Sequence, residues 1–184
     1  IAPEESVTIR QWREVIADIQ KIGASVIVLS GGEPMLRFDD IIELLESCDT
    51  GLSDFHLHTS GVGVTRSRAR RLARAGLIAA AVGIDDVDPA RHDALRGRPG
   101  SHRMATEAVI TFRNEGILPY LNACVTPALI RSGDLWNYLE MARILNVGFI
   151  QILEPRPCGG FFDGGGGEML SKEDRLAVQQ FVVT

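Results

Sequence analysis

Short apolar, β-branched segments alternate along this chain with segments in which apolar residues recur every three or four positions. This alternation predicts strands and helices in turn, and therefore a parallel sheet covered by helices. The predicted strands are 25–30, 55–59, 77–84, 117–126 and 149–153. Each one ends in a polar or glycine-rich cluster, and ligands of parallel α/β folds bind at the carboxyl ends of the strands. We therefore expect one composite site built from these strand ends.

The helical segments carry recognisable start and stop signals. We expect N-caps at Thr8, Thr65, Ser101 and Ser171, and C-caps or linkers at Gly76, Gly116 and Gly148. The first helix is predicted over 9–21, with an apolar side that should be buried on the sheet: Ile9, Trp12, Val15, Ile16, Ile19 and Ile22. A strand should precede this helix in a complete domain, so we expect residues 1–184 to be a single core domain that lacks its first strand.

Composition agrees with one globular domain. The chain has 184 residues, of which 45% are hydrophobic, and a formal net charge of −5. It contains neither an apolar run of about 18 residues nor a signal peptide, so we expect no membrane partner and a cytoplasmic location. The three cysteines, Cys48, Cys124 and Cys158, fit neither a disulfide framework nor a compact metal motif, which favours a reducing compartment.

Two further segments are interpreted as structural. Five arginines lie between Arg66 and Arg74 around Leu72, and because the chain is acidic and no aromatic residues interleave, we expect a solvated helix face and no nucleic-acid partner. The glycine run 164–167 lacks the lysine and the Ser or Thr of a P-loop, and it is predicted to be a flexible loop.

The first strand end reads Gly31-Gly32-Glu33-Pro34. Two glycines allow the backbone to approach a ligand closely, and Glu33 offers an anionic acceptor for an ammonium group. A purely structural turn is the alternative. The later strand ends carry Thr59-Ser60-Gly61, Asp85-Asp86, Asn122 and Glu154-Pro155.

These later ends also allow two interpretations. The hydroxyl groups after the second strand suit a carboxylate or a ribose, or they belong to an ordinary turn. Asp88-Pro89 resembles a helix start, which would account structurally for one acidic residue. Asn122 shares a strand face with Cys124, and a buried strand asparagine needs either a ligand or a local hydrogen-bond network.

His56 and His58 suggest a different class of enzyme. Two imidazoles at this spacing lie on one strand face, which is a sound geometry for a metal-dependent hydrolase with Asp85 or Glu154 as further ligands. His92 and His102 fall in loop or helical segments instead. A non-catalytic module that binds a partner or a nucleotide is a third possibility.

The order of these motifs over residues 8–184 resembles the radical S-adenosylmethionine (SAM) superfamily. The stretch from Asp88 to Gly97, with Gly100-Ser101, is similar to the branch that often carries C-terminal auxiliary-cluster (SPASM-type) domains and includes peptide-modifying enzymes. The resemblance implies an α/β fold, a parallel partial (β/α)6 TIM-like barrel, with the predicted strands as its second to sixth.

The resemblance also implies roles for individual residues. Gly31, Gly32 and Glu33, followed by Pro34, match the motif that holds the SAM amino group. Thr59, Ser60 and Gly61 match an element near the cofactor, with Ser60 in place of the usual asparagine. Gly83 stands where many relatives have a serine before Asp85, Asn122 matches a ribose-binding position, and Glu154 and Pro155 lie at the strand edge near the adenine.

One motif of the family is missing from the 184 residues, the Cys-x3-Cys-x2-Cys loop that binds a [4Fe–4S] cluster. We expect those ligands upstream of Ile1 and none among Cys48, Cys124 and Cys158. The implied activity is reductive cleavage of SAM to a 5′-deoxyadenosyl radical that abstracts hydrogen from a peptide or small-molecule substrate. An electron donor such as flavodoxin or ferredoxin is the implied partner.

Overall fold

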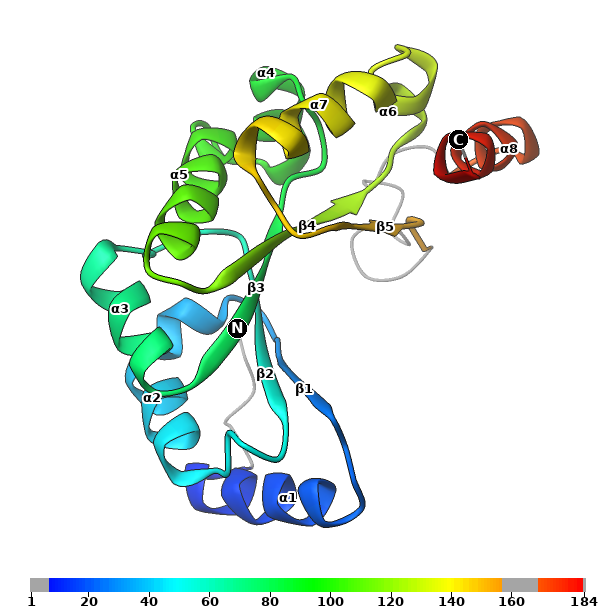
Figure 1. Cartoon of the computed structure of the whole chain (residues 1–184). Coiled ribbons are helices and arrows are strands. Elements are labelled where there is room, and N and C mark those ends of the chain that lie inside the picture. The colour runs from blue at the N-terminus through cyan, green and yellow to red at the C-terminus, as the bar shows by residue number, and fades with distance from the viewer. Residues whose placement is uncertain (1–6, 157–168, 184) are drawn as a thin grey trace.

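The computed structural model describes residues 7–156 and 169–183. Its five strands form one parallel sheet in chain order, which confirms all five predicted strands: β1 (Val26–Leu29), β2 (Asp54–Thr59), β3 (Leu77–Gly83), β4 (Leu118–Cys124) and β5 (Ile150–Leu153). The sheet is curled, and the helices lie along its outer side (Figure 1). The architecture is therefore the predicted partial TIM-like barrel.

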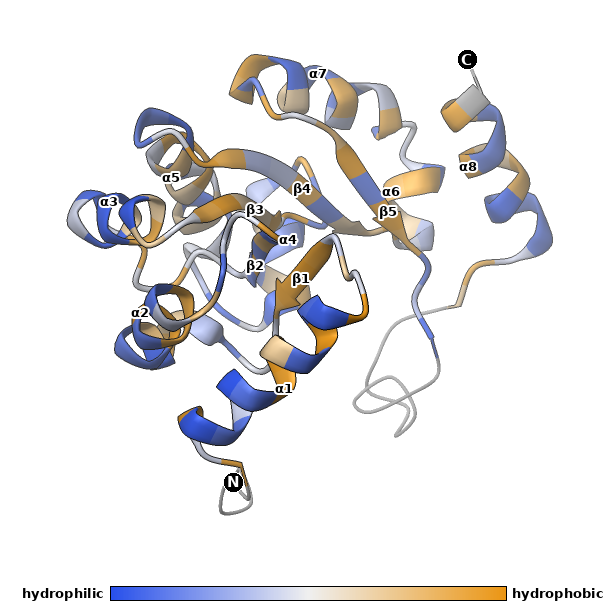
Figure 2. Ribbon diagram, turned by 60° about the horizontal axis from the view of Figure 1, so that its bottom comes forward, coloured by the Kyte–Doolittle hydropathy of each residue, from blue (hydrophilic) through white to orange (hydrophobic). Residues whose placement is uncertain are grey.

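Helices precede the first strand, connect the consecutive strands and follow the last one, and they cover the convex side of the sheet (Figure 1). They are α1 (Ile9–Lys21), the 3-10 helix η1 (Pro34–Arg37), α2 (Phe38–Ser47), α3 (Arg66–Arg74), α4 (Pro89–Arg96), α5 (Ser101–Asn114), α6 (Pro127–Arg131), α7 (Leu135–Leu145) and α8 (Lys172–Val183). The outward sides of α2 and α3 are largely hydrophilic, whereas the strands are mostly hydrophobic (Figure 2). Within the described ranges, no helix is long and apolar enough to cross a membrane.

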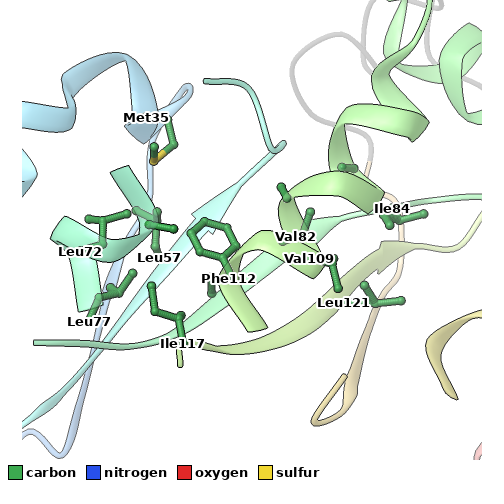
Figure 3. Close-up of a cluster of buried hydrophobic side chains, with 14 of the residues drawn as sticks. Met35, Leu57, Leu72, Leu77, Val82, Ile84, Val109, Phe112, Ile117 and Leu121 are labelled. Carbon is green, nitrogen blue, oxygen red and sulfur yellow. The ribbon is translucent and has the colours of Figure 1, made fainter. Parts of the chain in front are cut away.

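The main hydrophobic core lies between the convex face of the sheet and these helices. Figure 3 shows Phe112 of α5 among side chains from the strands and from α3. Phe112, Leu57 and Leu72 are completely buried. Because side chains alternate along a strand, the residues between the core positions point to the concave face. Those residues are His56, His58, Ala79, Ala81, Tyr120 and Asn122.

The expected burial of the α1 apolar side is wrong for three of its six residues, and Ile9 is half-buried. Ile16 is buried and Ile19 packs partly on the core, but Trp12, Val15 and Ile22 are exposed. β1 is an edge strand of the described sheet, so in this part of the chain the outer side of α1 has no further sheet surface to cover.

The helix caps were predicted with mixed success. The side chains of Thr8 and Thr65 accept hydrogen bonds from the first turns of α1 and α3, and Ser171 accepts one from Asp174 N. Ser101 is not an N-cap, because Gly100 occupies that position and Ser101 is the first residue of α5. Its hydroxyl donates instead to Asp93, which also accepts hydrogen bonds from the backbone N–H groups of Gly100 and His102.

The arginine-rich helix α3 has the expected organisation. Ala69 and Leu72 are buried, while Arg66 and Arg70 bind Glu115 at the surface. The predicted loop at 164–167 and Cys158 lie outside the described residues.

Candidate functional site

The Glu33 carboxylate joins the first two strand ends. Its Oε1 accepts hydrogen bonds from Met35 N (3.0 Å) and Thr59 Oγ1 (2.7 Å). Its Oε2 accepts hydrogen bonds from Ser60 N (2.8 Å) and Ser60 Oγ. A carboxylate has about four lone-pair positions, and here four internal donors use them. A ligand ammonium group would therefore have to share Glu33 with Ser60 or replace its hydroxyl as a donor.

The two glycine positions of this edge have different surroundings. Among the residues that the structure describes, a Cβ on Gly32 would meet no atom within 4 Å, so this part of the chain leaves the backbone there open to a ligand. Gly61 has φ +89° and lies against α5, where a Cβ would be 3.0 Å from Ala105 Cα. Thr59 Oγ1 accepts a hydrogen bond from Gly61 N (3.0 Å). Gly61 thus allows the close approach of α5, which gives it a structural role whatever else it does.

Asp85 lies at the third strand end, but it is buried and fully engaged by the protein. Its Oδ1 accepts a hydrogen bond from Cys124 N (3.0 Å), and its Oδ2 lies 2.6 Å from Arg96 Nε. Its own N–H donates to His92 Nδ1 (3.1 Å). The carboxylate therefore holds Arg96 in place and fixes the end of β4.

Arg96 is a candidate residue that the sequence interpretation did not single out. A Cβ on Gly83 would lie 2.6 Å from Arg96 Nη2, so the guanidinium occupies the space where a serine side chain would stand. This contact explains why glycine is compatible with position 83. Arg96 also lines a pocket of about 220 Å³ at the strand ends, together with Ser60, Val62, Gly83, His92, Arg98, Ser101 and Met104. The signal available in the sequence was the position of Arg96 within the stretch from Asp88 to Gly97, which also carries Asp93.

Asn122 has the clearest indication of a missing partner. It stands next to Gly83 in the register of β3 and β4. Its Oδ1 is buried and, within the part of the chain that the structure describes, has no hydrogen-bond partner. Buried polar atoms are rarely left unpaired, so a donor from a ligand would explain this amide.

The remaining acidic residues of the motifs serve the fold. Asp88 caps α4 before Pro89, as predicted for a helix start. Asp86 binds Arg91 through both carboxylate oxygens at 2.8 Å. Glu154 binds Arg175 of α8 at 2.5 Å, and this hydrogen bond holds the pKa of Glu154 below its usual value. Pro155, beside it, is buried.

His56 and His58 lie together on the concave face, and both imidazoles contact the same phenol. Tyr120 Oη lies 3.0 Å from His58 Nε2 and 3.3 Å from His56 Nδ1. Burial, with a smaller contribution from His56, lowers the pKa of His58, and burial raises the pKa of Tyr120. The hydrolase alternative needs a third ligand, and among the residues that the structure describes there is no group of three His, Cys, Asp or Glu that could hold a metal ion.

The described cysteines do not form a cluster site. Cys48 is the C-cap residue of α2 and packs partly on the core. Cys124 is the last residue of β4, far from Cys48 in the sequence. Burial raises the pKa of both thiols, and for Cys124 the Asp85 carboxylate adds to this effect. These residues do not fit a [4Fe–4S] cluster, which needs several thiolates at one place.

Comparison with known proteins identifies the family. The profile of the Radical SAM superfamily matches residues 2–142. The chain is 34% identical over 120 residues to a pre-heme d1 synthase of Dinoroseobacter shibae, an alignment that covers 65% of this chain and 29% of that protein. It is 34% identical over 94 residues to a PqqA peptide cyclase of Streptomyces rochei, which covers 51% and 26% of the two chains.

The fold comparison agrees. SuiB of Streptococcus suis, in its crystal structure with bound S-adenosylmethionine, superposes with a TM-score of 0.78 at 15% identity, covering 100% of this chain and 42% of SuiB. The chain thus spans less than half the length of the relatives and of SuiB. Members of this superfamily use SAM and a [4Fe–4S] cluster.

The strand ends fit the first of these cofactors. Asn122 Oδ1, which has no partner among the described residues, suits a hydroxyl group of SAM. The open backbone at Gly32 suits its ammonium group, and the anchored cation of Arg96 suits its carboxylate. Profile and fold lead to one conclusion: the chain belongs to the radical SAM superfamily.

Proposed function

We propose that the protein binds SAM at the carboxyl ends of β1 to β5 and acts as a radical SAM enzyme on a peptide or small-molecule substrate. The observation that carries this proposal is the buried Asn122 Oδ1, which has no partner among the described residues and stands beside Gly83 at the pocket rim. An empty acceptor at this place suits a ribose hydroxyl donor.

The charges at the strand ends match the amino-acid part of SAM. Arg96 uses Nε to hold Asp85, which leaves its Nη groups over Gly83 for the carboxylate. Glu33 accepts hydrogen bonds from Ser60, which lines the same pocket, and in our proposal its carboxylate binds the ammonium group of SAM. Gly31 and Gly32 leave the backbone accessible to that group.

The other strand-end residues support the site in our proposal. Thr59 and Gly61 hold the second strand end in position, and Glu154 and Pro155 border the adenine at the fifth. Bound SAM supplies, on reduction by one electron, a 5′-deoxyadenosyl radical that removes hydrogen from the substrate. The residues of this chain bind and orient SAM, and they exclude water around it.

The relatives support two kinds of substrate. One is named a pre-heme d1 synthase, another a PqqA peptide cyclase, and SuiB has been solved with its precursor peptide SuiA. We infer a substrate of either class, bound over the concave face of the sheet, and a flavodoxin or ferredoxin as electron donor.

Calorimetric titration with SAM tests the site. Asn122→Ala and Arg96→Met should each weaken binding about tenfold or more, since one lost charged or buried hydrogen bond corresponds to about 1.5–3 kcal/mol. Leu36→Ala, at an exposed residue of the neighbouring η1, is the matched control and should leave the affinity unchanged. Equal affinities in all three variants would place the cofactor elsewhere.

A second experiment separates an enzyme from a binding module. The protein encoded by the complete reading frame is reconstituted anaerobically with iron and sulfide and reduced with dithionite. Production of 5′-deoxyadenosine from SAM supports the enzyme. SAM binding without cleavage in a fully reconstituted sample would favour the non-catalytic alternative.

A further inference from the structure

The concave face of the sheet carries a cluster of three side chains, His56, His58 and Tyr120, that the proposed SAM contacts do not use. His58, Ala81 and Tyr120 lie side by side in the register of β2, β3 and β4, and His56 lies two residues before His58 on the same face. Tyr120 stands two residues before Asn122 on β4. The cluster thus forms the layer of side chains directly beneath the proposed cofactor site.

The phenol of Tyr120 is the centre of this cluster. Tyr120 is only 3% exposed, whereas His56 and His58 are half-buried. A ligand on the concave face would therefore contact the two imidazoles, and the Tyr120 hydroxyl would exchange protons with it only through them. The outer nitrogens, Nε2 of His56 and Nδ1 of His58, have no hydrogen-bond partner within the described ranges and are not among the buried polar atoms. Both are available to a ligand.

The hydrogen-bond chemistry links the protonation of the two rings. The phenol has one proton, so it donates to one imidazole and accepts from the other. If it donates to His58 Nε2, both rings carry their proton on Nδ1. If it donates to His56 Nδ1, both rings carry it on Nε2. The shorter contact, 3.0 Å to His58 against 3.3 Å to His56, favours the first arrangement.

We propose that His56, Tyr120 and His58 form a proton relay that serves a ring-bearing substrate with an ionisable O–H or N–H group on the concave face. The substrate X–H bond breaks and its electron pair stays on X, while the proton forms an N–H bond at His56 Nε2. His56 Nδ1 then gives its proton to the phenol oxygen, and the phenol proton moves to His58 Nε2. The proton on His58 Nδ1 leaves to water or to another substrate atom.

This transfer suits the surroundings because no member of the relay ends with a charge. Burial lowers the pKa of His58 and raises that of Tyr120, and both directions disfavour charged forms. Beside His56 and His58 the concave face presents Val26 and Val28 from β1, Ala79 and Ala81 from β3, and Phe149 and Leu153 at β5. All of these side chains are uncharged. The acidic residue of this face, Asp54, is the first residue of β2, two positions before His56, and it is exposed.

The same face indicates a ring in the substrate. Phe149 stacks on Tyr120 with ring centroids 4.2 Å apart and an interplanar angle of 18°. Phe149 remains 47% exposed, so its other face is available to a flat apolar group. Val26 and Val28 are similarly exposed on β1. A planar ring could therefore lie on Phe149 with its polar group at the imidazoles.

Side-chain nitrogen NMR tests the relay directly, since the chain has only four histidines. At neutral pH His56 and His58 should show the same tautomer, with the proton on Nδ1. Tyr120→Phe should change the nitrogen shifts of both rings. Tyr138→Phe, which removes a phenol that donates to Ile84 O, is the matched control and should change neither. Opposite tautomers in the parent, or unchanged rings in Tyr120→Phe, would overturn the relay.

The ligand class is tested with p-cresol as the probe and toluene as the matched ring without a hydroxyl. We expect p-cresol to shift the nitrogens of both His56 and His58 in the parent, and of His56 alone in Tyr120→Phe. Toluene should shift only the aromatic resonances of Phe149 and Tyr120. If p-cresol and toluene have the same effect, the assignment of an ionisable group to this site is wrong.

The substrate assignment rests on the proposed function, and a SAM titration separates the two. Tyr120→Phe should leave SAM affinity unchanged, whereas Asn122→Ala should reduce it about tenfold. Loss of SAM binding in Tyr120→Phe would mean that Tyr120 belongs to the cofactor site and would overturn the relay. Failure of the parent to bind SAM, with the linked tautomers intact, would refute the proposed function and leave the relay in place.

Discussion

Arg96 Nε lies 2.6 Å from Asp85 Oδ2, and this ion pair joins the end of α4 to the end of β3. Asp85 is 3% exposed, whereas the Arg96 side chain is 38% exposed and reaches the pocket. The buried carboxylate of Asp85 therefore affects the pocket only by fixing the position of the Arg96 guanidinium. In our proposal Asp85 positions the cation that meets SAM and does not touch SAM itself.

Asp85→Asn tests this relationship. The amide keeps an acceptor for Cys124 N but turns an N–H donor toward Arg96 Nε, so the buried ion pair is lost. We expect the free energy of unfolding to fall by about 1.5–3 kcal/mol and SAM affinity to fall with it. Urea denaturation and calorimetry measure the two effects. Asp88→Asn is the control, because asparagine also caps a helix well. Unchanged stability in Asp85→Asn would contradict the buried ion pair.

Gly32→Ala should separate binding from stability. The new Cβ would meet no atom of the described residues within 4 Å, so the free energy of unfolding should change by less than about 0.5 kcal/mol. A methyl group would still keep a ligand from the backbone, and we expect SAM affinity to drop about tenfold or more. Thermal unfolding and SAM titration on one preparation give both numbers. An unaffected affinity would remove this turn from the proposed site.

The sequence was sufficient to predict the sheet because the strand signals are local. All five strands and the 9–21 helix follow from runs of apolar residues and from caps such as Thr8 and Thr65. The burial of α1 was predicted less well, since Trp12 and Val15 need a neighbouring surface that periodicity alone does not reveal.

The contacts that individual side chains make were harder to predict. Glu33 and Asp85 lie at the predicted edge, yet their carboxylates bind Ser60, Thr59 and Arg96 across distances of 11 to 27 residues in the sequence. The local sequence pattern does not distinguish a carboxylate that is free to bind a ligand from one whose oxygens already accept hydrogen bonds from other parts of the protein. The Tyr120 contact with His56 and His58 was missed for the same reason, because it joins two strands.

Stability should decrease as the pH falls from 7 to 5. Burial is the main cause of a lowered pKa for His58, His92 and His102, so the unfolded chain binds more protons below the ordinary histidine value of 6.5. Above that pH, the contribution of these neutral histidines to the free energy of unfolding is fully present. It is lost as the pH falls toward the folded pKa, with a slope of at most about 1.4 kcal/mol per pH unit for each group.

The variant His92→Asn checks this pH dependence. Asparagine keeps an acceptor for Asp85 N but does not titrate, so urea denaturation between pH 7 and 5 should give a shallower slope than in the parent. Asp93 and Asp174 have pKa values of about 2, so their stabilisation is lost only at lower pH, below their ordinary value of 3.8. Identical slopes in parent and variant would exclude His92 as a source.

Glu33→Gln should destabilise the fold as well as weaken SAM binding. Each carboxylate oxygen accepts from one backbone N–H, that of Met35 or of Ser60. In glutamine one of these positions becomes an NH₂ group, so one backbone donor must face another donor whichever way the amide is turned. We expect a loss of about 1–3 kcal/mol in the free energy of unfolding.

The control for this change is Glu43→Gln, on the exposed side of α2, which should leave stability unchanged. SAM affinity is then measured below the unfolding transition, so that only folded protein contributes. A stable Glu33→Gln that no longer binds SAM would show that the carboxylate serves the ligand alone. A destabilised variant with full affinity would show that Glu33 serves only to hold β1 and β2 together, and that the SAM ammonium group is bound by the backbone.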